Sequence, residues 1–166
     1  GARSTRSSAR WDAASTRRSR DGTWVKRSKE SVFGFKLHVK TGIGCGLIRA
    51  VDASSASVHD SRVDLSESGE VVYRDKGCFG VTPRGFDATM RRGVRGHPLG
   101  EVDKNRNRRI GLKRRPVERV FAVLKRVFHA GRMLVTSLPR VRVKLVFSCF
   151  CFNLLQLGTI GVASAL

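Results

Sequence analysis

The sequence predicts an α/β protein in which helices pack against a mixed sheet. Apolar and polar residues alternate from residue 32 to residue 42, which is typical of a half-buried strand, and a second strand-like stretch follows a glycine-rich turn. Two long helical patterns close the chain after Pro116. Strands that precede long helices favour a sheet with helices packed on it.

Length and charge limit the function. The chain has 166 residues, which is one domain's worth and enough to bury a core without disulfides or metals. It carries 33 Lys plus Arg against 13 Asp plus Glu, for a formal charge of +20. Such an excess indicates a polyanionic partner, and nucleic acid is the leading candidate.

The first 31 residues are rich in Arg and Ser and nearly free of apolar side chains, so we expect a basic, poorly ordered leader. The folded region is expected over residues 32–160. Its first two strands, "VFGFKLHVKTG" (32–42) and "CGLIRAVDAS" (45–54), are predicted to form an antiparallel hairpin around the turn at 42–46. A third strand is predicted in "EVVYRD" (70–75), after the turn "ESG".

The connections and helices follow in order. Residues 54–65 are predicted to form a short helix or capped turn, and residues 82–112 a loop with at most a short helix around "FDATMRR" (86–92). A first long helix is predicted from Pro116 to about residue 129, because proline favours the opening position of a helix. A second is predicted over about 139–157.

The last 22 residues, "LVFSCFCFNLLQLGTIGVASAL" (145–166), hold no charge and are long enough to cross a bilayer. Polar Ser148, Asn153 and Gln156 and two late glycines favour a buried core helix instead. Four cysteines match no zinc spacing, and we interpret them as reduced and structural.

One acid stands inside the densest cationic stretch, "RRPVERVFAVLKR" (114–126). On a helical wheel, Glu118 falls between an apolar face and a face of arginines. A glutamate near a helix start stabilises the macrodipole by about 0.3–1 kcal/mol, and this remains an alternative to a chemical role.

A second acid, Asp75, follows the apolar run "VVY" and precedes Gly77, so we expect it at the carboxyl end of a strand, where open α/β sheets place their sites. Asp75 and Glu118 together could hold Mg²⁺, which prefers a few carboxylates plus water and phosphate oxygens. We expect their carboxyl groups within about 10 Å, because metal pairs in such sites are about 3.5–4 Å apart.

Three segments in the same order resemble the DDE transposases of bacterial and archaeal insertion sequences. They are residues 21–61, "VVYRDKGCFG" (71–80) and "RRPVERVFAVLKR" (114–126), and the last fits an R-x-x-x-E-x-x-x-x-x-x-K signature through Arg114, Glu118 and Lys125. The resemblance implies a ribonuclease-H-like mixed sheet flanked by helices. It also implies DNA transposition by metal-dependent strand cleavage and strand transfer.

The resemblance assigns roles to residues. Asp75 and Glu118 are expected to be catalytic and to hold two Mg²⁺ ions. Cationic side chains are expected to contact DNA phosphates. These are Arg114, Arg115, Arg119, Lys125 and Arg126. The expected partner is DNA, at the element ends and the target, with a homodimer in the DNA complex, no membrane, and a cytoplasmic, nucleoid-associated location.

The sequence also departs from the family pattern. Gly111 stands where a tyrosine is common, and Cys78 replaces a common aromatic residue. His59 and Asp60 match an "HD" element to which we assign no role. By the family's spacing, the first catalytic Asp is expected near or before residue 1. We do not assign Asp12 to this position, because it is only 21 residues before Phe33 and no apolar strand precedes it.

We therefore expect an N-terminally truncated catalytic domain that lacks its first strand and is inactive by itself. Asp21 matches a later acid of the family that has no catalytic role. The alternative function is that of a basic nucleic-acid-binding protein without catalysis, a class that the composition alone would favour.

Overall fold

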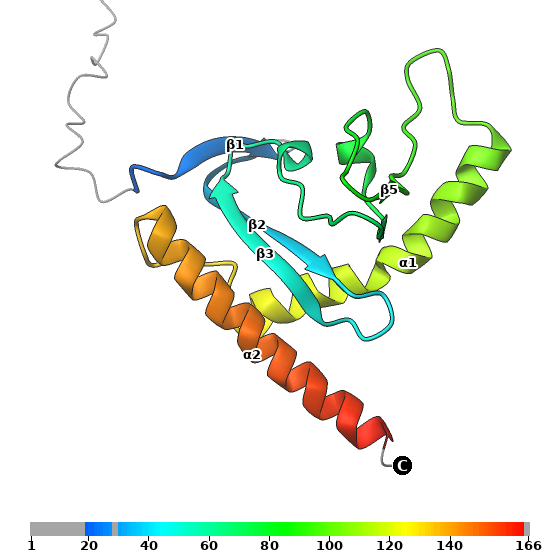
Figure 1. Ribbon diagram of the computed structural model, residues 1–166. Coiled ribbons are helices and arrows are strands. Elements are labelled where there is room, and N and C mark those ends of the chain that lie inside the picture. Colours follow the sequence, from blue (N-terminus) through cyan, green and yellow to red (C-terminus); the bar gives the residue numbers. More distant parts are fainter. Residues whose placement is uncertain (1–18, 28–29, 165–166) are drawn as a thin grey trace, which may run out of the picture.

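The computed structural model describes residues 19–27 and 30–164, and Figure 1 traces them from the first strand to the last helix. Three strands form an antiparallel sheet in the order β1-β2-β3, and two short strands form a separate parallel pair. The strands are β1 (Thr23–Arg27), β2 (Glu30–Thr41), β3 (Ile48–Ser55), β4 (Val71–Val72) and β5 (Phe86–Asp87). Two long helices complete the fold, α1 (Glu101–Arg126) and α2 (Leu138–Ser164).

The β2–β3 hairpin confirms the predicted alternation. Leu37 pairs with Ala53 and Val39 with Val51, so these apolar side chains share one face of the hairpin. The polar face carries Lys36, His38 and Lys40. The turn between the strands closes through Gly46, whose N–H donates to the Gly42 carbonyl oxygen over 2.9 Å and whose φ of 66° favours glycine.

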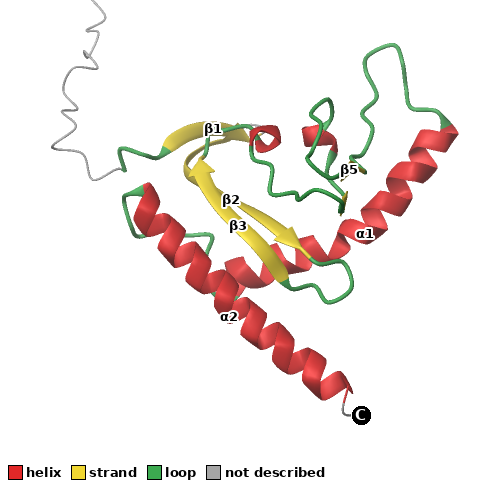
Figure 2. Cartoon of the chain, in the orientation of Figure 1, coloured by secondary structure: helices red, strands yellow, loops and turns green. Residues whose placement is uncertain are grey.

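Both long helices cover the apolar face of the hairpin. Leu124 of α1 and Phe152 of α2 pack with Ile48 of β3, and Leu37 and Val39 of β2 lie against the same cluster. A second cluster joins Val141 and Leu145 of α2 to Ala53. Figure 2 shows the resulting two layers, with the helices on one side of the three-stranded sheet. The predicted α/β architecture is confirmed at this level.

The first helix corrects the sequence prediction most strongly. We expected it to begin at Pro116, after a loop, but α1 begins at Glu101 and contains Pro116 in its interior. The segment 88–92 holds its first half in place. Asn107 accepts a hydrogen bond from the Arg91 N–H and donates to the Arg91 carbonyl oxygen, each over 2.9 Å. This tertiary contact could not be seen in local periodicity.

Other boundaries also differ. The third strand was predicted over 70–75, but regular pairing is limited to Val71–Val72. The stretch 86–92, predicted to be loop with at most a short helix, begins instead with β5, which pairs with β4 in parallel. β1 lies inside the segment expected to be a leader, and α2 extends past the predicted end at residue 157 to Ser164. The predicted capped turn in 54–65 is present as η2 (Asp60–Arg62).

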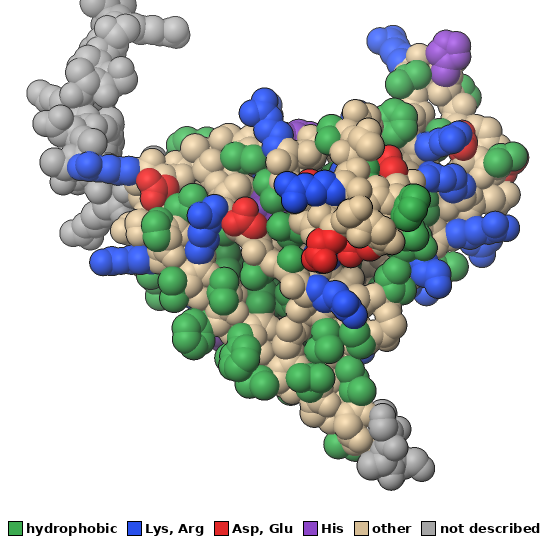
Figure 3. Space-filling view, in the orientation of Figure 1, with side chains coloured by type: hydrophobic (Ala, Val, Ile, Leu, Met, Phe, Trp, Pro, Cys, Tyr) green, Lys and Arg blue, Asp and Glu red, His purple; other side chains and the backbone are tan. Residues whose placement is uncertain are grey.

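α2 leaves much of its surface uncovered. By length and composition alone, residues 138–162 could cross a membrane, and 22% of the most apolar window is buried inside the protein. The face toward the sheet is buried and carries Val141, Leu145, Cys149 and Phe152. Phe147 and Phe150 are more than half exposed on the opposite face, where Figure 3 shows hydrophobic side chains gathered along the helix.

Candidate functional site

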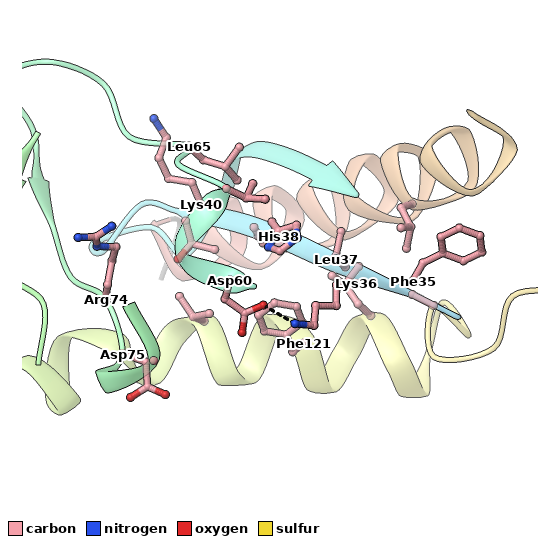
Figure 4. Close-up of a pocket in the computed structure, with 18 of the residues that line it drawn as sticks. Phe35, Lys36, Leu37, His38, Lys40, Asp60, Leu65, Arg74, Asp75 and Phe121 are labelled. Carbon is pink, nitrogen blue, oxygen red and sulfur yellow. Dashed lines mark ion pairs between the residues drawn. The ribbon is translucent and has the colours of Figure 1, made fainter. Parts of the chain in front are cut away.

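A cavity of about 1200 Å³ lies between β2, the segment 60–78 and α1. Val117 and Phe121 of α1 form part of its apolar floor, and Leu65 lies across from them. Asp60 and Asp75 both line the same cavity (Figure 4). This volume exceeds the roughly 300–1,000 Å³ of ordinary small-molecule pockets. The cavity therefore suits a polymer or a chain segment better than a metabolite.

Asp75 lies shortly after β4, close to the strand-end position that the sequence predicts. It is the N-cap of the short helix η3 (Lys76–Cys78), and its Oδ1 atom accepts a hydrogen bond from the Lys76 N–H over 2.8 Å. The same oxygen is 3.4 Å from Nη1 of Arg114 on α1. The Asp75 side chain is 60% exposed, so this carboxylate can still meet a ligand from solvent.

Glu118 lies on α1, one helical turn after Arg114, and its side chain is exposed. Residues four apart on a helix lie on the same face, so Glu118 is one turn along α1 from the arginine that pairs with Asp75. The cavity lining includes Arg114 and Lys125 but not Glu118, which places Glu118 outside the cavity wall. The predicted closeness of Asp75 and Glu118 stays a prediction.

Asp60 is an acid of this site to which sequence reasoning assigned no role. Its Oδ1 atom is 3.1 Å from Nζ of Lys36, and the same Nζ donates to the Val58 carbonyl oxygen over 2.8 Å. These two contacts fasten the 58–62 turn to the polar face of β2. The short helix η2 in this turn contacts η3, whose N-cap is Asp75. The "HD" dipeptide was the sequence signal for this position.

Arg74 fixes the chain just before Asp75. Its Nε atom donates to Thr89 Oγ1 over 2.9 Å, and its Nη2 atom donates to the Val81 carbonyl oxygen and lies 3.6 Å from Asp87 Oδ1. Partial burial tends to raise the pKa of Asp87, but hydrogen bonds from Thr89 and the charge of Arg74 outweigh it and hold that pKa below its usual value. The loop that carries Asp75 is thus anchored by a charged network.

His38 lies on the polar face of β2 and also lines the cavity. Its Nε2 atom is 2.8 Å from Ser54 Oγ. Burial lowers the pKa of His38, although the charges of Asp60 and Asp52 oppose the shift. We therefore assign the neutral imidazole to this position at neutral pH.

Exposed cations form a stripe along α1. Arg115, Arg119 and Arg126, predicted from sequence to contact phosphates, are exposed on one side of the helix. The structure adds Lys104 and Arg108, which the sequence analysis had placed in a loop. The spacing of four and seven residues keeps all five on one face. From residue 104 to residue 126 the stripe is about 33 Å long at 1.5 Å per residue, and Lys and Arg also gather over the first half of α1 in Figure 3.

Arg114 and Lys125 lie on a different side of α1, toward the cavity. Arg114 pairs with Asp75, whereas Lys125 is exposed at the rim. The five predicted DNA-contact residues thus divide into an outer group of three and an inner pair that lines the cavity.

The donor chemistry around Asp75 suits a hard divalent cation, since two carboxylates are available near a cavity that admits solvent. Within the described residues, however, no group of three or more Asp, Glu, His or Cys side chains is arranged to hold a metal ion. The Oδ1 atom of Asp75 is 3.4 Å from Nη1 of Arg114.

Comparison with known proteins gives one match. The model of a protein family described as "Transposase DDE domain" matches residues 9–154, which is most of the chain. No curated protein and no solved structure matches.

Proposed function

Because the chain belongs to the family of transposases with a DDE domain, we propose that it acts on the ends of an insertion sequence, through a ribonuclease-H-like site built around Asp75 and Glu118. The family supports DNA as the substrate and a divalent metal as the cofactor. The observation that carries the proposal is Asp75, close after β4 at the mouth of the cavity, paired with the Arg114 that lies one turn before Glu118.

Each part of the site has a proposed task. Asp75 and Glu118 would hold Mg²⁺, which when bound supplies the charge that stabilises attacking and leaving oxygens in phosphoryl transfer. Arg114 neutralises Asp75 in the free protein and is placed to contact a scissile phosphate beside it. Arg115, Arg119 and Arg126 hold the flanking duplex along the outer stripe, and Lys125 adds a cation at the cavity rim.

We further propose that this chain alone binds DNA without cutting it. The family uses three carboxylates, and this chain offers two with assigned places, so a metal pair would lack a shared ligand. Asp12 lies outside the described residues. Without cleavage, the chain would act as a basic DNA-binding protein, which is the class that the composition alone favours. We place this activity in the cytoplasm, at the nucleoid, with a homodimer on the DNA.

The test compares nicking of a supercoiled plasmid that carries the element ends, in Mg²⁺ or Mn²⁺, by this chain and by the polypeptide extended with the residues encoded upstream. The extended protein should nick, and Asp75→Asn or Glu118→Gln should each abolish nicking while DNA binding persists. Glu101→Gln is the matched control, because Glu101 is an exposed acid of the same helix that pairs with Lys104 outside the site.

Two results would contradict the proposal. Cleavage that survives both Asp75→Ala and Glu118→Ala would show that these acids are not the site. Robust cleavage by the unextended chain, lost in Asp12→Ala, would show that Asp12 is the third acid.

A further inference from the structure

The outer face of α2 carries a regular apolar seam that stays largely exposed in the described part of the chain. From residue 143 onward, apolar or small residues recur at alternating steps of four and three. This is the spacing of a helix that packs along another helix. The five apolar side chains of the seam are 51–65% exposed. The α2 seam consists of Val143, Phe147, Phe150, Leu154, Leu157 and Gly161.

The seam lies opposite the face that α2 buries. At about 100° per residue, all six seam positions fall within about 40° of one direction around the helix. Val141, Leu145 and Phe152, which are buried against the sheet, point the other way. Figure 1 shows the carboxyl end of α2 extending past the hairpin. The helix therefore has two apolar faces, and the sheet covers only one of them.

α2 cannot span a bilayer while it keeps its place on the sheet. Asn153 hydrogen-bonds to both backbone groups of Ile48, each over 2.8 Å. Gln156 donates to the Cys45 carbonyl oxygen over 3.1 Å. Insertion would break these bonds and leave the amide groups in hydrocarbon without partners. The seam is therefore better suited to an apolar surface that docks from solvent.

The seam is complementary to a second copy of itself. Its spacing reads the same in both directions from residue 152. An antiparallel copy centred on that residue would bring the seam residues together in layers of two, repeated by the two-fold axis. The layers are Val143 with Gly161, Phe147 with Leu157, and Phe150 with Leu154.

Charge favours the antiparallel arrangement. The cations Arg140, Arg142 and Lys144 lie in the first two turns of α2, and no charge follows Lys144. A parallel copy would place the two sets of cations side by side. An antiparallel copy places each set near the carboxyl end of the partner helix, where the macrodipole is negative and favours cations.

We propose that the α2 seam joins two copies of this chain into an antiparallel dimer in the absence of DNA, a property that does not depend on the proposed function. The seam is about 27 Å long at 1.5 Å per residue. Together with Val146 beside it, the seam exposes roughly 600 Å² of apolar side chain per copy, on a scale where a fully buried aromatic side chain contributes about 150–250 Å². A total of roughly 1,200 Å² is at the low end for specific interfaces, so we expect a micromolar dissociation constant.

The first test is sedimentation velocity of the full chain over a concentration series through the micromolar range. The wild type should pass from monomer to dimer, whereas Phe147→Lys and Leu154→Lys should each stay monomeric. Val102→Lys is the matched control, because it adds the same charge at an 83% exposed position of α1 and should dimerise like the wild type. Thermal melts show that the variants fold, which we expect because each replaced side chain is more than half exposed.

A variant that strengthens the dimer makes the test independent of variants that lose it. Gly161 leaves a gap opposite Val143 in the outermost layer, and a side chain at this position would meet nothing within 4 Å in the single chain. Gly161→Leu should therefore tighten the dimer by about tenfold or more, since it adds one buried leucine to each end of the interface.

Disulfide trapping tests the direction of the helices. Phe147→Cys and Leu157→Cys are prepared separately, each together with Cys151→Ser, because Cys151 is exposed on the same helix. The two proteins are mixed with a mild oxidant. An antiparallel seam gives disulfides between the two different variants, whereas a parallel seam links each variant to itself. The chain with Cys151→Ser alone shows the background of cross-linking.

Salt separates this dimer from association through bound nucleic acid. Each copy has a formal charge of +20, so added salt should screen the repulsion between copies and strengthen the dimer. Association bridged by DNA should weaken as salt is added.

Three results would overturn the proposal. They are a chain that stays monomeric throughout the series, a dimer that persists in both lysine variants of the seam, and disulfides that form only between like variants. Binding of a monomeric chain to phosphatidylcholine–phosphatidylserine vesicles, lost in Phe147→Lys, would show that the seam meets a lipid surface instead and would also overturn it. None of these readouts involves DNA cleavage, so failure here leaves the cleavage proposal standing.

Discussion

The Oδ1 atom of Asp75 has two partners, the backbone N–H of Lys76 and the guanidinium of Arg114. The first contact caps a short helix and fixes the direction of the side chain. The second supplies positive charge at a place where a metal ion is proposed to bind. The backbone N–H of Lys76 therefore orients the Asp75 carboxylate, and Arg114, which we expect to contact DNA phosphate, balances its charge.

At the residue scale, the Arg74–Asp87 network gives a pH prediction. The pKa of Asp87 is lowered in the folded protein, so its contribution to stability is present above the usual aspartate value of 3.8 and is lost as pH falls through the folded value. Asp87→Asn should cost roughly 1 kcal/mol at pH 7 through lost hydrogen bonds. Urea unfolding should show this difference at pH 7, and the difference should shrink as the pH is lowered below 3.8.

The control for that experiment is Glu101→Gln, an exposed acid with a single surface ion pair. A difference between wild type and Asp87→Asn that does not shrink as the pH falls below 3.8 would contradict the ionic part of the argument.

At the element scale, polar side chains of α2 hydrogen-bond to backbone groups of the β2–β3 hairpin and hold the helix on it. Asn153 accepts from the Ile48 N–H and donates to the Ile48 carbonyl oxygen, each over 2.8 Å. Gln156 donates to the Cys45 carbonyl oxygen over 3.1 Å. These polar residues, which interrupt an apolar run in the sequence, thus bind the start of β3 and fix the position of the helix along it.

The first element-scale prediction concerns Asn153. Asn153→Leu keeps the volume but leaves both backbone groups of Ile48 without their partner, and should lower the free energy of unfolding by about 2–4 kcal/mol. Gln156→Leu removes one hydrogen bond and should cost about 1 kcal/mol. Chemical denaturation of both variants measures the contrast, and equal losses would show that the Asn153 pair is unimportant.

A second element-scale prediction concerns the proline inside α1. Pro116 has no N–H to donate to the Leu112 carbonyl oxygen, and an interior proline costs a helix about 3 kcal/mol. Pro116→Ala should therefore raise the melting temperature and leave DNA affinity unchanged. A lower melting temperature would mean that proline at this position helps α1 to pack on both β2 and the 88–92 segment.

At the scale of the whole molecule, charge and apolar surface are separated. The excess of cations lies largely outside α2, whose sequence has no charge after Lys144. The stripe on α1 is long enough to follow about one turn of B-form DNA, which rises about 34 Å. This separation leaves one surface for a polyanion and another for an apolar contact.

The whole-molecule prediction is that DNA binding has a steep salt dependence with little sequence preference, since phosphate contacts release counterions. Arg115→Glu with Arg119→Glu should reduce the slope of log affinity against log salt by about 2, at about 0.9 per phosphate contact. The matched control is Arg132→Glu with Arg140→Glu, which makes the same charge change at exposed positions away from the stripe and outside the cavity lining. Equal slopes in both double variants would show that α1 is not the contact surface.

The sequence alone determined the features that depend on near neighbours. Alternation over residues 32–42 gave the β2–β3 hairpin, the apolar positions of 117–124 gave the buried face of α1 with Val120 and Leu124 at its centre, and the run before Asp75 placed that acid close after a strand. Each is a local period, which the chain carries whatever it packs against.

Only the tertiary structure decided what depends on distant partners. The first half of α1 has no clear apolar period and is held by the hydrogen bonds between Asn107 and Arg91. The Lys36–Asp60 ion pair joins residues 24 positions apart in the sequence. The separation of the three-stranded sheet from the β4–β5 pair depends on all five strands together. The sequence of a single strand does not determine which of its two backbone edges will pair with another strand. That edge is set by where the other strands fall in space, because hydrogen bonds across a sheet join residues that the sequence keeps apart.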